Sequence, residues 1–214
     1  MRLYKFRTLE NIEFVLDIVL CERLYCSYYS DLNDPFEGLF NVIIGGMQMA
    51  YSNNISVAKS LQNLLIESGE ENLNICSLSS SLEDVRLWSH YADGHRGIAI
   101  AIDFPEMHNQ LFPVTYSETL PSFAGGILAE KPTIKEVLSC KTNHWDYEAE
   151  YRLFHYEKYF PIPNMIKVIY LGSRIPSTKR ELLYRIIPKE IALYETIIDR
   201  DKIVVKPDRH IERF

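Results

Sequence analysis

The stretch Ile98-Ala99-Ile100-Ala101-Ile102 decides the fold class of this 214-residue chain. A strand with one face in water alternates apolar and polar side chains, whereas every residue of this stretch is apolar. Such an unbroken run is typical of a central strand whose two faces are both covered. We therefore expect a β-sheet built around residues 98–102.

Further strands and helices are predicted on both sides of this stretch. Apolar or alternating runs predict strands at residues 3–7, 24–27, 73–79, 167–171, 191–198 and 202–206. Apolar side chains at helical spacing, or capping residues, predict helices near residues 9–19, 52–67, 81–92, 133–138 and 178–187. Because strands and helices do not alternate regularly, we expect one α+β domain over residues 1–214, with a central, mostly antiparallel sheet flanked by helices.

Two helix starts and two irregular regions complete this outline. Thr8 is expected to cap the first helix, and Ser81 with Asp84 has the spacing of a capping box for the third. Residues 39–50 fit either a loop or a strand. Residues 105–143 are interrupted by prolines and glycines, so we expect a long connection that acts as a mobile lid or insertion.

Composition and charge narrow the class of protein. The net charge of −6 gives no basic footprint for duplex DNA, and 47% hydrophobic residues suffice for a core. The sequence starts without a hydrophobic signal core and has no apolar run near the ~20 residues of a membrane span, so we expect a cytoplasmic protein. The four cysteines, which form no C-x-x-C pair, are expected to be reduced thiols: Cys21, Cys26, Cys76 and Cys140.

The stretch Trp145-Asp-Tyr-Glu-Ala-Glu-Tyr-Arg152 contains the strongest candidate site. If it is an extended strand, Glu148, Glu150 and Arg152 project from one face. Neighbouring carboxylates destabilise a sheet unless a cation or a ligand covers them. The face is therefore either a solvated surface neutralised by Arg152 or a functional site. If Glu150 is exposed there, Glu150→Gln should keep the fold and remove activity.

Several motifs of the chain resemble those of a bacterial and prophage family catalogued as domain of unknown function twenty-nine seventy-one. They are Leu3-Tyr-Lys-Phe-Arg7, Asn33-Asp-Pro-Phe-Glu37, Leu87-Trp-Ser-His-Tyr-Ala92 with Gly97 before an apolar strand, the stretch from Trp145 to Arg152, and Val168-Ile-Tyr-Leu-Gly172. They cover nearly the whole chain and occur in the right order. The family label carries no reaction, so this resemblance implies only a consistent fold.

A second resemblance, to the ADP-ribosyltransferase superfamily, implies a reaction. A first strand ending in Arg7, a serine-bearing strand and a later E-x-E look like the three-part site of that superfamily, although Ser77-Leu-Ser-Ser-Ser81 departs from its Ser-Thr-Ser. The resemblance implies an NAD-dependent transferase, of toxin or phage-defence type, in which Arg7 contacts the phosphates or ribose of NAD. Ser79 would support the nicotinamide side, and Glu150 would be catalytic.

The same resemblance gives roles to residues around these three. Glu148 would orient the acceptor, a protein or nucleic acid, and Tyr91 would stack on nicotinamide. The turn from Asn33 to Glu37 would form the rim of the binding cleft, and Asn33 would contact the cofactor. We therefore expect Arg7, Ser79 and Glu150 to line one cleft.

Two other functions use the same residues. Asp34, Glu37, Glu148 and Glu150 could hold Mg²⁺ or Mn²⁺ for phosphodiester hydrolysis, assisted by Lys141 or Lys167. Alternatively, the aromatic residues could line the pocket of a non-enzymatic module that senses a small ligand or nucleotide. The chain lacks the H-E-x-x-H, P-loop, G-x-S-x-G and G-x-G-x-x-G motifs, so the corresponding enzyme classes lose support.

Overall fold

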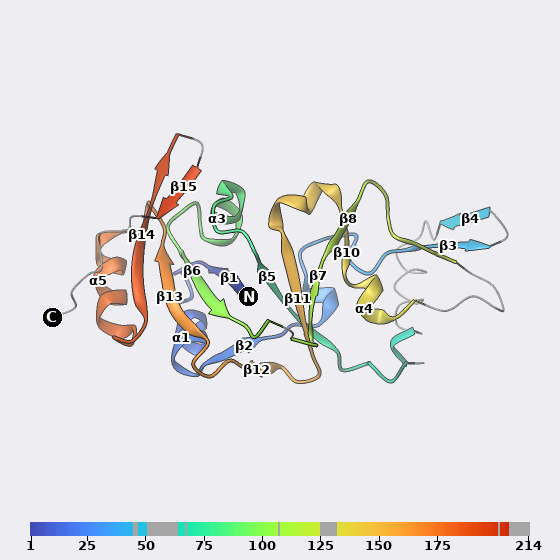
Figure 1. The fold of residues 1–214 in the computed structure, drawn as a ribbon, viewed down its shortest axis with the longest axis horizontal. Helices are drawn as coiled ribbons and strands as arrows, with labels where there is room; N and C mark the ends of the chain where they lie inside the picture. The colour runs from blue at the N-terminus through green and yellow to red at the C-terminus, as the bar shows by residue number, and fades with distance from the viewer. Residues whose placement is uncertain are drawn as a thin grey trace.

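An eight-stranded sheet runs through the computed structural model, which describes residues 1–44, 47–50, 64–66, 68–106, 108–124, 132–200 and 202–205 (Figure 1). In spatial order its strands are β15 (Lys202–Val205), β14 (Ala192–Asp199), β13 (Ile166–Leu171), β6 (Ile98–Asp103), β1 (Arg2–Arg7), β5 (Asn74–Ser79), β11 (Glu150–His155) and β7 (Leu111–Pro113). Within the described residues of this eight-stranded sheet, only β13 and β14 pair in parallel. The prediction of an α+β fold with a mostly antiparallel central sheet is therefore confirmed.

The apolar strand β6 lies between β13 and β1 and is covered on both faces, as predicted. Its isoleucines join a core that includes Val15 of α1 (Ile12–Leu20) and Leu183 of α5 (Ser177–Ile186). Its alanines face the other way, where Trp88 of α3 (Val85–Tyr91) packs on the sheet. The small alanine side chains leave room for the indole ring.

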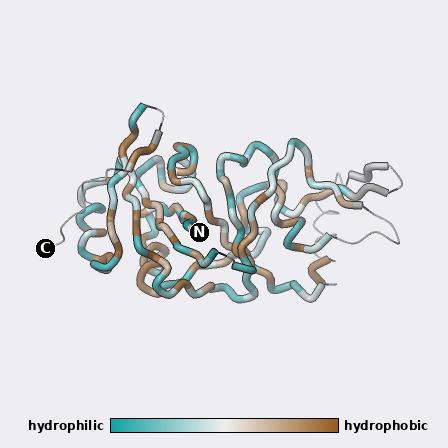
Figure 2. Tube along the Cα trace, viewed as in Figure 1, coloured by the Kyte–Doolittle hydropathy of each residue, from teal (hydrophilic) through white to brown (hydrophobic). Residues whose placement is uncertain are grey.

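Three smaller sheets and short helical segments complete the described fold. β2 (Arg23–Tyr25) pairs with β12 (Tyr159–Pro161), β8 (Thr115–Ser117) pairs with β10 (Cys140–Thr142), and β3 (Asn41–Ile44) lies between β4 (Met47–Ala50) and β9 (Ser122–Ala124). The helical segments are α4 (Ile134–Val137), η1 (Tyr29–Asp31) and η2 (Asn143–Glu148). Figure 2 shows brown, hydrophobic residues along much of the large sheet. Within the described ranges, no helix is long and apolar enough to cross a membrane.

Several local predictions are wrong. The acidic strand begins only at Glu150, because residues 143–148 form the 3₁₀ segment η2. Residues 105–143 are not one long connection, since their described part contains β7, β8, β9, α4 and β10. The α1 helix starts after Asn11 rather than Thr8, and Asp84 alone caps α3 by accepting from the Arg86 amide.

Other predictions are settled in part. The described part of residues 39–50 forms the hairpin of β3 and β4, whereas the helix predicted over 52–67 lies mostly outside the described residues. Gly69 has a φ of +73°, as expected of a glycine that ends a helix. The short helix predicted near 133–138 is α4, which Thr133 and Glu136 cap reciprocally.

Two glycines of the quoted motifs hold the turn after α3 against the sheet. A Cβ atom on Gly97 would lie 2.2 Å from the Arg7 carbonyl oxygen. A Cβ atom on Gly172 would lie 2.2 Å from the His95 carbonyl oxygen. Only residues without a side chain allow these approaches. The backbone at the end of β1 is therefore fixed where Arg7 projects.

Replacing Trp88 with alanine should destabilise the protein by about 3 kcal/mol or more, since large-to-small changes in a core leave a cavity. The ring is fully buried, packs edge-on against Phe6 at 5.2 Å and donates from Nε1 to the Leu82 carbonyl. Urea unfolding would measure the loss. Trp145→Ala, which removes a half-buried tryptophan, is the matched control, and equal losses in the two variants would contradict the assignment of Trp88 to the core.

Candidate functional site

A cavity of about 340 Å³ opens where β1 and β5 separate. The two strands pair at one position only, Tyr4 with Ser79. Beyond it Ser27 takes the place of β1 beside β5 and pairs with Ile75. The cavity is lined by residues 4–7 of β1, residues from 25 to 33, residues from 75 to 79 of β5, and Leu87, Tyr91, Lys141, Glu148 and Glu150.

All six residues predicted for the site line this one cavity: Arg7, Asn33, Ser79, Tyr91, Glu148 and Glu150. The expectation that Arg7, Ser79 and Glu150 meet in space is confirmed. Their chemical roles remain predictions.

Arg7 and Glu150 nevertheless project from opposite faces of the sheet. Ser79 lies opposite both Tyr4 and Glu150, so these three residues share a face. Arg7 is three positions from Tyr4 and lies opposite Ile98, on the other face. A ligand would contact Arg7 and Glu150 together only in the gap between β1 and β5. The common face that the transferase resemblance requires for them is therefore not found.

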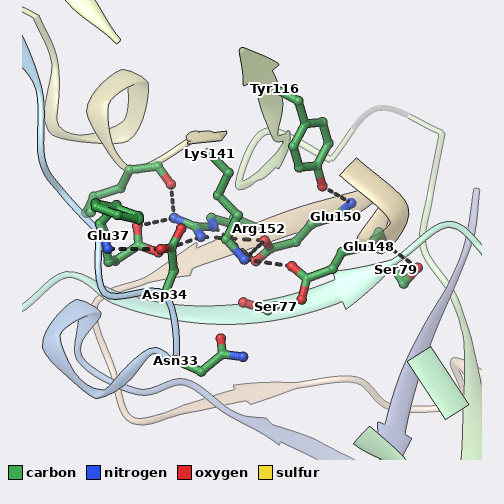
Figure 3. Close-up of polar contacts among 12 residues, drawn as sticks. Asn33, Asp34, Glu37, Ser77, Ser79, Tyr116, Lys141, Glu148, Glu150 and Arg152 are labelled. Carbon is green, nitrogen blue, oxygen red and sulfur yellow. Dashed lines mark hydrogen bonds and ion pairs between the residues drawn. The ribbon is translucent and has the colours of Figure 1, made fainter. Parts of the chain in front are cut away.

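A network of buried charges, drawn in Figure 3, reaches the cavity through Lys141, Glu148 and Glu150. Arg152, which is 0% exposed, donates to Glu150 at 3.0 Å and to both oxygens of Glu37 at 2.5 and 2.8 Å. Its Nη1 also donates to the Leu138 carbonyl. Lys141 Nζ lies 2.7 Å from a carboxylate oxygen of both Glu148 and Glu150.

The interpretation of this acidic face as solvated surface is wrong. Glu148 is only 5% exposed and Glu150 only 4%. Glu150→Gln would therefore alter a buried ion pair rather than an exposed charge. The prediction that this replacement leaves the fold untouched rests on exposure and loses its basis.

Glu148 reaches the network from a turn and not from a strand. Ala149 has a φ of +41°, and this left-handed residue joins η2 to β11. Ser79 Oγ donates to the Glu148 carbonyl at 2.6 Å, and the Tyr116 hydroxyl accepts from the Glu150 amide at 2.8 Å. These contacts bring two carboxylates from different segments to Lys141.

Lys141 is the counter-ion that sequence reasoning missed, since it was considered only as a helper in phosphodiester hydrolysis. It comes from β10, whose parallel pairing with β8 gives no local signal in the sequence. The pKa of Lys141 is raised, because the nearby Glu150 and Glu148 outweigh its burial. Lys141 therefore remains charged.

The carboxylates respond differently to their surroundings. Burial alone would raise the pKa of Glu150, but Arg152 and Lys141 outweigh it and lower that pKa to about 2. For Glu37 burial prevails over Arg152, and the pKa is raised. When all are ionised, the three carboxylates exceed Arg152 and Lys141 by one negative charge.

The opposite wall is cationic. Lys5 Nζ donates to the Ser77 carbonyl at 2.7 Å, and Arg7 Nε is buried with no hydrogen-bond partner. Burial lowers the pKa of both side chains. Across the described residues neither forms an ion pair with a carboxylate. Both are therefore available to an anionic ligand, which would relieve the desolvation of the two charges.

Tyr91 and Asn33 separate this cavity from an outer groove. Asn33 Nδ2 donates to the Tyr91 hydroxyl at 2.9 Å, and that hydroxyl donates to Glu148. Burial and this bond raise the pKa of Tyr91, which stays neutral. The groove, of about 700 Å³, is also lined by the aromatic rings of Phe36 and Trp145.

The carboxylates are not arranged as a metal site. Asp34 accepts from the Phe36 amide and does not line the cavity, while Glu37 is bound on both oxygens by Arg152. No group of three His, Cys, Asp or Glu side chains within the described ranges has the arrangement of metal ligands. The site found here therefore gives the metal-dependent hydrolase no support.

Replacing Arg152 with methionine should destabilise the protein by about 3–5 kcal/mol, because it leaves Glu37 and Glu150 buried without their main cation. Chemical unfolding would measure the change. The control is Arg2→Met, which removes an arginine whose pair with Asp103 is about 40% exposed and should contribute less than about 1 kcal/mol. Similar losses in the two variants would contradict a buried network.

Acid should weaken the fold partly through Glu150. Its folded pKa of about 2 lies below the ordinary value of 4.5. The stabilisation is therefore present above about pH 4.5 and is lost as the pH falls toward 2. At about 1.4 kcal/mol per pKa unit, wild type should lose roughly 3 kcal/mol more than Glu150→Gln over this window. Unfolding midpoints measured against pH would test this, and parallel curves would contradict it.

Comparisons with family models, with curated proteins and with solved structures find no match to this chain.

Proposed function

We propose that the cavity binds the nicotinamide-ribose-phosphate part of NAD and that the chain transfers its ADP-ribosyl group. The single observation that carries this proposal is the charge layout of the cavity. Lys141, Glu148 and Glu150 form a wall that carries one net negative charge when all three are ionised. Lys5 and Arg7 form a cationic wall with no carboxylate partner in the described residues.

The layout complements a ligand that carries both signs of charge. Because these two walls lie on opposite faces of the sheet, the ligand would have to cross the gap between β1 and β5. A pyridinium ring linked to ribose would lie toward Glu148 and Glu150, and the phosphates would lie toward Lys5 and Arg7. A cavity of about 340 Å³ is at the small end for ligand sites, and it suits one half of a dinucleotide better than the whole. The other half would extend toward solvent.

The proposed chemistry requires a carboxylate that is ionised at neutral pH. Glu150 meets this requirement, because Arg152 and Lys141 keep its pKa at about 2. As the bond between ribose C1′ and nicotinamide nitrogen breaks, its electron pair leaves with nicotinamide and positive charge develops on the sugar. A fixed negative wall stabilises that charge more than it stabilises the ground state.

The outer groove suits the acceptor side of the reaction. It meets the cavity at Asn33 and Tyr91, which line both spaces. The bond from the Tyr91 hydroxyl to Glu148 links this boundary to the acidic wall. A nucleophile entering from the groove would meet Glu148 first, which agrees with an orienting role for this residue.

A binding-only module is the second candidate. Its support is the complete pairing of Glu150, which contacts Arg152 and Lys141 and has little exposed surface. In that case the cavity would recognise the same kind of ligand without breaking a bond.

Incubation of the purified protein with NAD, in the presence of cell lysate as a source of acceptors, should release nicotinamide and add ADP-ribose to one of its components. Glu150→Gln should lower the rate at least about 100-fold, since it removes an electrostatic contact to the transition state. Mass spectrometry would detect both products. Glu190→Gln, an exposed replacement of the same kind, should leave the rate unchanged.

Stability must be measured alongside, because Glu150 is buried. Arg7→Gln provides a second test, as it should weaken NAD binding while leaving the acidic wall intact. Binding without release of nicotinamide would favour the binding-only module. Failure of NAD to bind would overturn both readings of the cavity as an NAD site.

A further inference from the structure

We propose that Cys26 and Cys76 form a reversible disulfide behind the cationic wall of the cavity. The two thiols belong to segments far apart in sequence, yet they lie in one apolar core and are each only 1% exposed. Lys5 and Arg7 are their charged neighbours. Besides sharing this core, the two residues are set opposite each other by the strand register.

The register comes from the bridge between Ser27 and Ile75. These residues exchange both backbone hydrogen bonds, at 2.9 and 2.8 Å, so they are a hydrogen-bonded antiparallel pair. Continued by one residue, this register sets Cys26 opposite Cys76 at a non-hydrogen-bonded position, where the Cys26 amide donates elsewhere, to the Lys158 carbonyl. Cα atoms in such pairs are about 4.5 Å apart. Disulfides span Cα separations of about 4.4–6.8 Å.

The surrounding charges favour one thiolate. A hydrogen bond from Cys26 lowers the pKa of Cys76 despite its burial, and Lys5 and Arg7 lower it further. The pKa of Cys26 is raised by its hydrogen bond to Cys76 and by burial. Lys5 donates to the carbonyl of Ser77, the residue next to Cys76, so the cation lies on the Cys76 side of the pair. We therefore assign Cys76 as the nucleophile and Cys26 as the resolving thiol.

The oxidant that we propose is a peroxide. The Cys76 thiolate attacks one peroxide oxygen, the O–O bond breaks, and hydroxide leaves as Cys76 becomes a sulfenic acid. The Cys26 thiol, as it loses its proton, attacks the Cys76 sulfur and displaces hydroxide, which takes up that proton as water. Two electrons pass from the sulfurs to the peroxide. The cavity would be the route of approach for a peroxide, because its lining includes Ser27 and Ser77, the chain neighbours of the two buried cysteines.

Oxidation changes the cavity wall electrostatically. In the reduced protein, the Cys76 thiolate offsets part of the positive charge of Lys5 and Arg7. The disulfide removes that negative charge and leaves both cations to the ligand. A phosphate-bearing ligand should therefore bind the oxidised form more tightly. This consequence rests on the proposed function, but formation of the disulfide does not depend on it.

The test uses the full chain with Cys21→Ser and Cys140→Ser, which leaves only the proposed pair. Treatment of the folded protein with a few equivalents of hydrogen peroxide, alkylation and digestion should yield a peptide that joins Cys26 to Cys76. Its mass should be two hydrogen atoms below the sum of the two reduced peptides. Dithiothreitol should reverse the linkage. Adding Cys26→Ser should abolish the linkage and leave Cys76 as sulfenic or more oxidised acid.

Absence of the joined peptide, with both thiols still alkylated after unfolding, would overturn the disulfide. Inorganic pyrophosphate then tests the coupling to the cavity, and its dissociation constant should fall about tenfold on oxidation. An unchanged constant would overturn the coupling and leave the disulfide in place. If the disulfide forms but NAD binds neither redox form, the proposed function fails while this inference stands.

Discussion

The buried guanidinium of Arg152 is the interaction on which the site depends. It joins Glu37, from the turn after η1, to Glu150, at the start of β11, and its bond to the Leu138 carbonyl reaches the end of α4. Removing such a group from water is unfavourable unless several partners surround it. Three segments distant in sequence are therefore held in register by one side chain. Lys141 extends the same network to Glu148 and the cavity.

The central sheet was predictable because its signals are local. The unbroken apolar run at residues 98–102 is typical of a buried strand, and the alternation at 73–79 is typical of a half-buried one. They correspond to β6 and β5. The strand predicted at residues 145–149 was wrong because its signal was also only local. Its alternating letters fit a strand, but the left-handed Ala149 and the Ser79 and Tyr116 contacts turn the chain there. Those contacts span 34 or more positions and leave no trace in a short window of sequence.

The sequence predicted which residues belong to the site, but not how they are arranged around the cavity. Arg7 and Ser79 were predicted to end strands, and Glu150 was predicted to lie on a strand whose acidic face needs a cationic neighbour. The cavity does join these three residues. The face from which Arg7 projects depends on the single pairing of Tyr4 with Ser79, a long-range register that no local pattern encodes. Burial of the acidic face was missed because its main cation beyond Arg152 is Lys141, contributed by β10.

The single paired position between β1 and β5 also has a mechanical meaning. On one side of it β15, β14, β13, β6 and β1 form a continuous ladder, and on the other side β5, β11 and β7 form another. Few backbone hydrogen bonds join the two ladders there, and the contact from Lys5 of β1 to the Ser77 carbonyl of β5 supplements them. The cavity lies at this junction. A ligand that bridges Lys5 and Glu150 would therefore connect the two ladders where the backbone connects them least.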